Sequence, residues 1–338
     1  MSPRLSGPEP QVAKNAGYDD PPKRMGFFTD TSICIGCKAC EVACKEWNAV
    51  PDDGYNLLGM SYDNTGSLGA STWRHVAFIE QSKPIGLQDA GYAGLPMGGP
   101  ISEAVGHQAA EAMATLATSK LGTDTGSLDV LGAFSQTEPA AAEPGEVRDS
   151  MRWLMSSDVC KHCTHAGCLD VCPTGAIFRT EFGTVVVQED ICNGCGYCVP
   201  ACPYGVIDRR EEDGRAFKCT LCYDRIGEGM KPACAQACPT ESIQFGELDE
   251  LRVRAAGRLD QLVEAGVSSA QLYGENPDDG VGGAGSIFLL LDAPEVYGFP
   301  PDPVVPTRDL VSMWKHAAAA AGVLVGITVG AFASGRRS

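Results

Sequence analysis

The segment Cys192-Asn-Gly-Cys-Gly-Tyr-Cys-Val-Pro-Ala-Cys-Pro203 decides the fold of this chain. Its cysteines are separated by two, two and three residues, and a proline follows the last one. The chain repeats this plan, with some stretched gaps, so that all 16 cysteines fall into four groups. In chain order, groups one to four are Cys34, Cys37, Cys40 and Cys44; Cys160, Cys163, Cys168 and Cys172; Cys192, Cys195, Cys198 and Cys202; and Cys219, Cys222, Cys234 and Cys238. Grouping in fours is typical of metal sites and rare among disulfide frameworks.

The spacing within each group has a physical reason. A [4Fe–4S] cluster is held by four thiolates, and three closely spaced cysteines can surround one cluster with a tight loop. The fourth cysteine, expected at the start of a helical turn, points away and reaches a second cluster, as in bacterial two-cluster ferredoxins. Gly36, Gly194 and Gly196 let the backbone approach the inorganic sulfides closely. Sixteen cysteines are enough for four clusters, and four such centres on one chain indicate a path for electrons.

Other uses of the cysteines fit less well. Paired C-x2-C knuckles bind zinc in many proteins, but a zinc site needs neither a third cysteine two residues further on nor the Cys-Pro step. Disulfide-stapled domains are usually much shorter than 338 residues and richer in cysteine. His162 and His165 lie beside group two, and we expect them to hydrogen-bond the cluster loop rather than to bind metal.

Composition and motifs exclude several other functions. Hydrophobic residues are 44% of the chain and charged residues 20%, which indicates a folded protein rather than a disordered one. The net charge of −17 argues against nucleic-acid binding, which needs a basic surface. The sequence contains no Gly-x-Gly-x-x-Gly after a strand, no Walker loop and no Gly-x-Ser-x-Gly motif. No catalytic residue is therefore predicted.

Short strands are predicted around the cysteine groups, and a helix follows group four. The expected strands are 27–29, 73–80, 176–179, 184–187, 206–210, 216–218 and 287–291, and the helix is 247–265, ended by Gly266. Residues 81–150 contain much glycine and alanine and no cysteine, with an Ala-rich helix predicted at 101–121. We interpret them as a surface insertion, with a docking loop for a partner as the alternative.

The C-terminal stretch Ala317 to Gly335 carries no charged residue. As a helix it would be about 28 Å long, close to the ~30 Å core of a bilayer. Trp314 precedes it where an interfacial aromatic is expected, and Gly322, Gly326 and Gly330 form a stripe suited to membrane helix packing. A soluble Ala-rich helix is the alternative, but each glycine would weaken it by roughly 1 kcal/mol. The pattern favours a membrane helix.

On these residues the chain resembles the iron–sulfur (beta) subunit of membrane-bound, molybdenum- or tungsten-dependent formate dehydrogenases. These belong to the four-cluster electron-transfer subunits of the dimethyl-sulfoxide-reductase superfamily. The matching text is C-I-G-C-K-A-C-E-V-A-C-K-E-W-N from Cys34, W-R-H-V-A-F-I-E from Trp73, C-K-H-C-T-H-A-G-C-L-D-V-C-P from Cys160, C-N-G-C-G-Y-C-V-P-A-C-P-Y from Cys192, and group four between Lys218 and Thr240.

Two further features resemble formate dehydrogenases rather than their cousins. One is Y-G-E-N-P-D-D-G-V-G-G from Tyr273, which continues to Y-G-F at Phe299, and the other is V-S-M-W-K ahead of the apolar helix. The resemblance covers most of 25–80 and 151–335 and leaves out the insertion 81–150. In the related nitrate reductases one ligand of group three is tryptophan, whereas Cys195 and its neighbours are all present here.

The resemblance implies a crossed ligand pattern, in which group one shares its clusters with group four and group two with group three. Cluster one would take Cys34, Cys37, Cys40 and Cys238; cluster two Cys44, Cys219, Cys222 and Cys234; cluster three Cys160, Cys163, Cys168 and Cys202; and cluster four Cys172, Cys192, Cys195 and Cys198. The fold implied is α+β, with two pseudo-symmetric ferredoxin-like modules holding four [4Fe–4S] clusters, plus a C-terminal membrane helix.

The predicted domain boundaries follow from this pattern. They are an extended N-terminal arm at 1–25; one module at 26–80 and 203–246, from groups one and four; the insertion at 81–150; the second module at 151–202, from groups two and three; a helix, strand and Pro-rich linker at 247–310; and the C-terminal transmembrane helix at 311–338.

The expected function is electron transfer in anaerobic respiration, and the chain itself is not expected to be an enzyme. Electrons from formate oxidation on a molybdopterin catalytic (alpha) subunit would pass through four clusters to a membrane cytochrome b (gamma) subunit and quinone. The alternative is the same role for another molybdopterin oxidoreductase or a hydrogenase.

The expected location is the cell membrane, with a single C-terminal pass. Arg308 and Lys315 before the helix balance Arg336 and Arg337 after it, so charge leaves its orientation open. The family implies that the cluster domain lies outside the cytoplasm. Residues 1–30 show no secretory signal, so export would need a partner that carries a twin-arginine signal.

Overall fold

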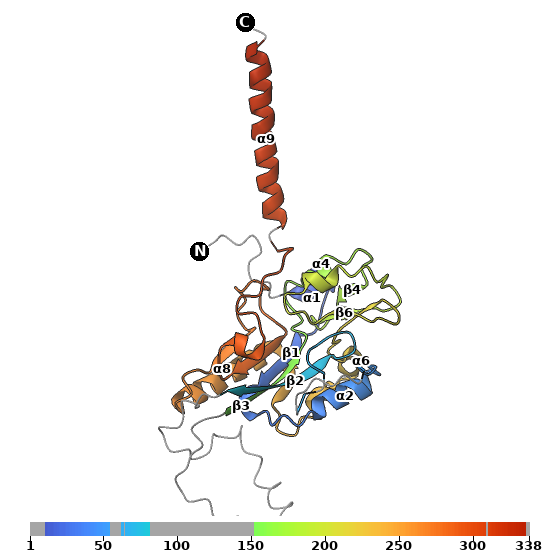
Figure 1. The fold of residues 1–338 in the computed structure, drawn as a ribbon, viewed down its shortest axis with the longest axis vertical. Coiled ribbons are helices and arrows are strands. Elements are labelled where there is room, and N and C mark those ends of the chain that lie inside the picture. The colour runs from blue at the N-terminus through green and yellow to red at the C-terminus, as the bar shows by residue number, and fades with distance from the viewer. Residues whose placement is uncertain (1–10, 55–61, 64, 82–151, 309, 336–338) are drawn as a thin grey trace, which may run out of the picture. The chain divides into compact units, whose positions relative to one another are not determined.

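The computed structural model describes residues 11–54, 62–63, 65–81, 152–308 and 310–335 (Figure 1). By its contacts the chain divides into a unit of Met1–Gln81 with Trp153–Ser338 and a second unit of Ser82–Arg152. The predicted insertion 81–150, with its expected helix at 101–121, lies outside the described residues except for Gln81. The first unit carries every cysteine, and its described part has mixed helix and strand structure.

A four-stranded sheet in the order β8-β1-β10-β9 is the scaffold of this unit. β1 (Met25–Asp30) pairs in parallel with β10 (Ser286–Leu290), with Phe27 opposite Ser286. β8 (Ile243–Glu247) runs antiparallel to β1, and β9 (Gln271–Tyr273) runs antiparallel to β10. Every residue of β10 is buried, as expected of a central strand. The sheet therefore joins the segment that precedes group one to the segments that follow group four.

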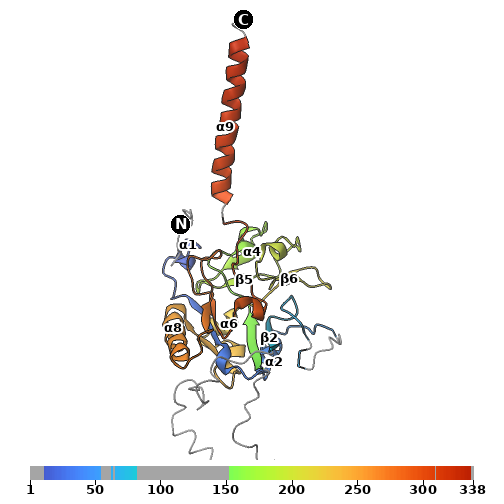
Figure 2. The ribbon, with the colours of Figure 1, turned by 60° about the vertical axis from the view of Figure 1, so that its left-hand side comes forward.

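The helix predicted over 247–265 is confirmed as α8 (Leu248–Glu264), which packs against β1, β8 and β10. It lies beside the sheet in both views (Figure 1 and Figure 2). Leu248, Leu251, Ala255 and Leu262 are buried and recur at helical spacing, so they form the face that covers the sheet. Gly266 has a φ of +89° after the helix, a conformation that glycine adopts without strain.

The cysteine groups lie in loops joined by short elements. Both predicted hairpins are present and antiparallel: β4 (Ile177–Arg179) with β5 (Val185–Val187), and β6 (Asp208–Arg209) with β7 (Ala216–Phe217). The strand predicted at 73–80 is β2 (Arg74–Gln81), which pairs with β3 (Arg152–Val159). These strands are short, so the cysteine loops have little backbone pairing of their own.

Each third cysteine lies in a short helix. The helices are α2 (Ala39–Trp47) with Cys40, α4 (Gly167–Asp170) with Cys168, α5 (Cys198–Ala201) with Cys198, and α7 (Ala233–Gln236) with Cys234. The fourth cysteine was expected at the start of a helical turn, and this expectation is wrong. Cys172, Cys202 and Cys238 follow the ends of their helices, and Cys44 lies near the end of α2. A gap of three residues therefore carries the backbone through about one turn before the fourth cysteine.

The remaining elements connect these parts. They are η1 (Thr31–Ile33) after β1, α6 (Tyr223–Gly227) after Cys222, and η3 (Pro294–Tyr297), a short 3-10 helix within the Pro-rich linker. The predicted N-terminal arm contains α1 (Val12–Asn15), so it is not extended there. Val12 and Ala13 are buried, and the Met25 N–H donates to the Phe182 carbonyl at 3.0 Å. Apolar contact with the protein therefore folds part of this segment.

The C-terminal helix α9 (Leu310–Gly335) contains the uncharged stretch Ala317 to Gly335 and begins one residue before the predicted boundary at 311. Within it, Met313–Phe332 is long and apolar enough to cross a membrane, and none of its most apolar stretch is buried. Leu324 and Phe332 are 65% and 76% exposed, although water does not favour exposed apolar side chains. Among the described residues, this one helix is a candidate for a single C-terminal membrane pass.

Candidate metal centres

All 16 cysteines lie within the described residues, and none of them forms a disulfide. Most are buried or partly buried, whereas Cys37 and Cys195 are exposed. In the described part of the chain, no three cysteine, histidine, aspartate or glutamate side chains meet as ligands of a single metal ion. The thiols instead surround small spaces, as the ligands of a many-atom cluster must.

One cavity lies between group one and the end of group four. Its thiols come from Cys34, Cys37, Cys40 and Cys238. Three of these cysteines belong to one loop, while the fourth lies about 200 residues away in the sequence. The structure therefore brings together the set that the resemblance implied for cluster one.

The loop around this cavity depends on Gly36. Its φ is +64°, and a Cβ there would lie 2.6 Å from a ring carbon of Phe78 and 2.7 Å from the sulfur of Met155. Gly194 and Gly196, at the matching turn of group three, also have positive φ values of +72° and +77°. These tight turns, predicted to need glycine, need it for backbone conformation and, at Gly36, for space.

A second cavity lies between groups two and three. Its thiols come from Cys160, Cys163, Cys168 and Cys202. Its remaining wall is formed by backbone and by apolar, aromatic and cationic side chains, among them Val185, Ile207, Tyr204 and Lys218. This set matches the one implied for cluster three, again with three cysteines from one group and one from its partner.

The other two sets are visible in the electrostatics of the thiols. Burial raises the pKa of Cys44, and the neighbouring Cys219, Cys234 and Cys222 raise it further. Burial also raises the pKa of Cys198 to about 11, and its neighbours Cys192, Cys195 and Cys172 contribute in the same direction. These are the sets implied for clusters two and four. Two of the four sets thus line a cavity each, and the thiols of the other two sets influence one another's charge.

Hydrogen-bond donors surround the sulfur atoms. The Leu221 N–H lies 3.3 Å from Cys219 Sγ, and the Ala216 N–H lies 3.4 Å from Cys192 Sγ. Asn48 Nδ2 lies 3.8 Å from the sulfurs of both Cys44 and Cys222. Donors of this kind stabilise thiolate charge and tune the potential of a bound cluster.

The donor set fits iron–sulfur clusters. Burial raises the pKa of Cys40 and of Cys168 to about 12, so four such thiols brought together would stay protonated without a cation among them. Iron supplies that cation, because metal binding requires and stabilises the thiolate form. The sequence alternative of zinc would use four ligands around one ion, whereas these thiols line spaces.

Two buried cations beside the thiols were missed by the sequence analysis. Arg74 of β2 is 1% exposed, and its Nη2 lies 3.3 Å from Cys234 Sγ. Lys218 is also 1% exposed and lines the second cavity. Burial lowers the pKa of each, but thiolate charge from neighbouring cysteines outweighs it, so both values lie above the usual range. The sequence offered one signal for each: Arg74 is a charged residue at an inward position of a strand, and Lys218 is a charged residue directly before a cysteine.

The two histidines of group two behave as neighbours of the cluster loop. His162 lines the second cavity, and its Nδ1 accepts a hydrogen bond from the Val185 N–H at 3.1 Å. Burial, with Lys218 and Arg24 nearby, holds its pKa well below the usual value, so the ring is neutral. The backbone N–H of His165 donates to the Val281 carbonyl at 2.8 Å, which ties this loop to the segment that precedes β10.

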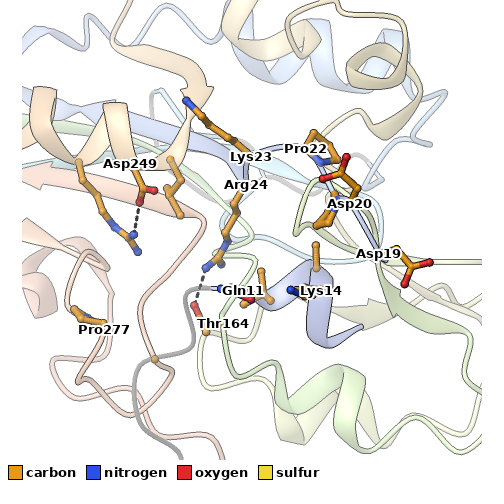
Figure 3. A pocket seen from close by; sticks show the side chains of 16 residues that line it. Gln11, Lys14, Asp19, Asp20, Pro22, Lys23, Arg24, Thr164, Asp249 and Pro277 are labelled. Atoms are coloured by element: carbon orange, nitrogen blue, oxygen red, sulfur yellow. Dashed lines mark hydrogen bonds and ion pairs between the residues drawn. The ribbon is translucent and has the colours of Figure 1, made fainter. Parts of the chain in front are cut away.

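A larger cavity of about 610 Å³ lies near α1 and the start of α8 (Figure 3). Its charged side chains form contacts with other residues of the lining: Arg24 Nη1 donates to Thr164 Oγ1 at 2.8 Å, and Asp249 accepts from Arg252 at 3.0 Å (Figure 3). None of the described residues that line it is a cysteine or a histidine. The candidate metal centres are therefore the thiol clusters and not this cavity.

Comparison with known proteins supports an iron–sulfur assignment. The model of the 4Fe-4S dicluster domain matches residues 151–248, which include groups two, three and four. The iron–sulfur subunit of the nitrate-inducible formate dehydrogenase of Escherichia coli is 34% identical over 292 residues, which cover 85% of this chain and 76% of that protein. The formate dehydrogenase iron–sulfur subunit of Haemophilus influenzae is 33% identical over 291 residues, covering 85% and 71%.

A subunit of a different oxidoreductase is similar over a shorter part of the sequence. The B subunit of the anaerobic dimethyl sulfoxide reductase of Escherichia coli is 31% identical over 230 residues, which cover 68% of this chain and 76% of that protein. The likeness to the formate dehydrogenase subunits thus extends over more of the present sequence.

Proposed function

Because this chain is a member of the family of formate dehydrogenase iron–sulfur subunits, we propose that it carries electrons from formate oxidation within a formate dehydrogenase complex. The observation that carries the proposal is the second cavity, where Cys202 of group three completes a set begun by Cys160, Cys163 and Cys168. Sharing of cysteines between two groups is how ferredoxin-type domains hold two clusters close enough for electron transfer.

The chain holds four [4Fe–4S] clusters in this proposal, with crossed ligation. The ligands are Cys34, Cys37, Cys40 and Cys238 for cluster one; Cys44, Cys219, Cys222 and Cys234 for cluster two; Cys160, Cys163, Cys168 and Cys202 for cluster three; and Cys172, Cys192, Cys195 and Cys198 for cluster four. The cavities and the mutual electrostatic influence of these thiols support the assignment.

The chain contributes a scaffold and an environment rather than catalytic groups. The clusters supply one-electron chemistry when bound. The protein supplies thiolates, sulfur-directed N–H donors such as Leu221 and Ala216, and apolar walls such as Val185 and Ile207 that exclude water. The two-module arrangement, with groups one and four in 26–80 and 203–246 and groups two and three in 151–202, accounts for the pairing of the thiol sets.

Partners and location complete the proposal. A molybdopterin subunit, with molybdenum or tungsten, oxidises formate and delivers electrons, and a membrane cytochrome b accepts them for quinone reduction. The exposed apolar helix α9 supports anchoring beside that membrane subunit. In this proposal the cluster domain lies on the extracytoplasmic side of that membrane.

The test is purification of the complex from its native membrane. We expect about sixteen irons for each copy of this chain, in addition to the iron of its partner subunits, and no stoichiometric zinc, since a cubane cluster holds four irons. Formate added to the complex should bleach the cluster absorbance, and the isolated chain should not react with formate. Zinc in place of iron would refute the proposal.

Protease added to intact spheroplasts should cut the cluster domain, and full protection would place it in the cytoplasm.

A second candidate, an electron-transfer subunit of another molybdopterin oxidoreductase, is favoured by the similarity to the B subunit of dimethyl sulfoxide reductase. The same purified complex separates the two. Formate should reduce the clusters if the first proposal holds. If a sulfoxide reoxidises chemically reduced clusters while formate leaves oxidised clusters unchanged, the second candidate holds instead.

A further inference from the structure

Arg74 links the thiol sets of clusters one and two through contacts with both. Its Nη2 lies 3.3 Å from Cys234 Sγ in the cluster-two set. Its Nη1 lies 3.1 Å from the Ser157 carbonyl and 3.3 Å from the Ser157 hydroxyl, which itself lies 3.2 Å from Cys40 Sγ in the cluster-one set. A single buried guanidinium thus reaches one set directly and the other through one hydroxyl.

Lys218 occupies the corresponding place between the sets of clusters two and three. Lys218 is one of the residues that line the cavity of Cys160, Cys163, Cys168 and Cys202. Its Nζ donates to the carbonyl oxygen of Cys219, a member of the cluster-two set, at 3.1 Å, and to that of Val185. Each of these two junctions therefore contains one buried positive charge.

These two cations differ from Arg258 and Lys161, two other buried cations of the same unit. Arg258 is buried against Asp30, with its Nε 2.9 Å from the carboxylate, and Lys161 pairs with Asp158. Within the part of the chain that the structure describes, neither Arg74 nor Lys218 has a carboxylate within 4.0 Å. Burying a charge without a partner is costly, so the thiolates are the charges that hold these two side chains inside.

We propose that Arg74 and Lys218 are positioning residues that set the reduction potentials of the clusters on either side of them. This inference rests on the proposed function. Arg74 acts on clusters one and two, and Lys218 acts on clusters two and three. Each electron that arrives from the catalytic subunit adds one negative charge beside a fixed positive charge. The arrangement favours the reduced state of these clusters and raises their potentials.

The charge of Arg74 stays constant while electrons pass. A guanidinium does not lose its proton in proteins, so one electron enters a cluster and one leaves it without a proton moving at this residue. The hydrogen bond to Cys234 Sγ gives the cation its position, and the Ser157 hydroxyl extends its influence to Cys40. The charge of Arg74 and its hydrogen bonds therefore make separable contributions to the reduction potentials of the clusters.

The experiment is a redox titration of the purified complex, monitored by electron paramagnetic resonance. Arg74→Gln removes the charge, Arg74→Lys keeps it, and Arg258→Gln makes the same change at a buried arginine that has a carboxylate partner. We expect Arg74→Gln to shift the reduction equilibrium of two clusters about tenfold toward the oxidised form, which is 59 mV for a one-electron couple. Arg74→Lys should recover most of that shift, and Arg258→Gln should shift the potentials less than Arg74→Gln does.

Full iron content with unchanged potentials in Arg74→Gln would overturn the inference while leaving the proposed function intact. An equal shift in Arg74→Gln and Arg74→Lys would also overturn it, because geometry rather than charge would then be responsible. Absence of clusters, or of their reduction by formate, in the unmodified complex would instead refute the proposed function.

If the Arg74→Gln protein does not bind its clusters, the variants Lys218→Gln and Ser157→Ala test the inference instead. Lys218→Gln should lower the potentials of two clusters, and Lys218→Arg should restore them. Ser157→Ala should lower the potential of cluster one alone, since it removes only the hydroxyl between Arg74 and Cys40. Potentials equal to those of the unmodified complex in both variants would overturn the inference.

Discussion

The four-stranded sheet and the cysteine loops are built in different ways. In the sheet, Phe27, Phe28, Phe288 and Leu289 are completely buried, and the helix α8 closes the core with further apolar side chains. In the loops around groups two and three, the core contains Ile177, Val185 and Ile207, and partly buried cysteines pack against it. The sheet therefore has a core made by the protein alone, whereas the core of the loops is completed by what the thiols bind.

The largest effect that tests this comparison is expected on removal of iron. A chelator under reducing conditions should raise hydrogen exchange sharply in β4 and β5, because metal binding supplies folding free energy where the site is not preformed. The amides of β1 and β10 should stay protected, since apolar burial holds them. Exchange measured by mass spectrometry over 176–187 and 286–290 checks this, and simultaneous loss of protection would show that the two parts fold as one.

Loss of one thiol should affect one cluster. Cys202→Ala should remove the cluster held by Cys160, Cys163 and Cys168, because Cys202 lines their cavity, and should lower iron by about a quarter. Cys198→Ala, on the preceding helical turn, is the matched control and should remove the cluster of group three. Electron paramagnetic resonance and iron analysis distinguish them. If Cys202→Ala removed only the cluster of Cys192, Cys195 and Cys198, the crossed ligation would be wrong.

The sheet side of the comparison is tested by its apolar core. Leu262 is completely buried in α8, so Leu262→Ala should destabilise this part by about 2–5 kcal/mol. Its neighbour Val263 is 50% exposed, and Val263→Ala should change stability by about 0.5 kcal/mol or less. Exchange of the β1 amides measures both, while cluster absorbance should stay unchanged at 25 °C. Bleaching of the clusters by Leu262→Ala would show that the loops depend on this core.

The helix α9 belongs to neither kind of core. Gly326→Leu adds bulk to a stripe of small residues, and the described structure has open space around an added Cβ there. We expect weaker association with the membrane subunit and unchanged clusters, because membrane helices pack closely on small residues. Detergent titration of the complex measures the loss, with Val325→Leu as the control on another face. Equal effects of both substitutions would show that the stripe of small residues has no special role in association with the membrane subunit.

The smallest effect is expected at the edge of the sheet. The hydrogen bond and charge of Glu247 raise the pKa of Lys23, which is fully exposed. Since the folded pKa is above the unfolded one, this contribution is present below the unfolded value and lost as the pH rises through the folded one. Lys23→Met should therefore lower the melting temperature slightly at pH 8 in low salt, and the difference should vanish as the pH rises through the folded pKa of Lys23. A difference in melting temperature that grew as the pH rose would contradict the expected pH dependence.

Much of the fold was predictable because its signals are local. The hairpin of β4 and β5, the helix α8 and the apolar helix α9 each follow from the spacing of apolar residues and from glycine at turns. The N-terminal segment was predicted wrongly at α1, because Val12 and Ala13 are buried by residues far away in the sequence. Local composition carries no information about such a contact.

By itself the sequence determined the chemistry of the site, because it contains four groups of cysteines whose spacing suits iron–sulfur clusters. Only the tertiary structure placed Cys238 with Cys34 and Cys202 with Cys160, which the sequence could suggest by resemblance alone. It also placed Arg74 against a sulfur 160 residues further along the chain. The physical reason is that ligand spacing is a property of a short loop, whereas the partner of a buried charge depends on which distant segments the sheet brings together.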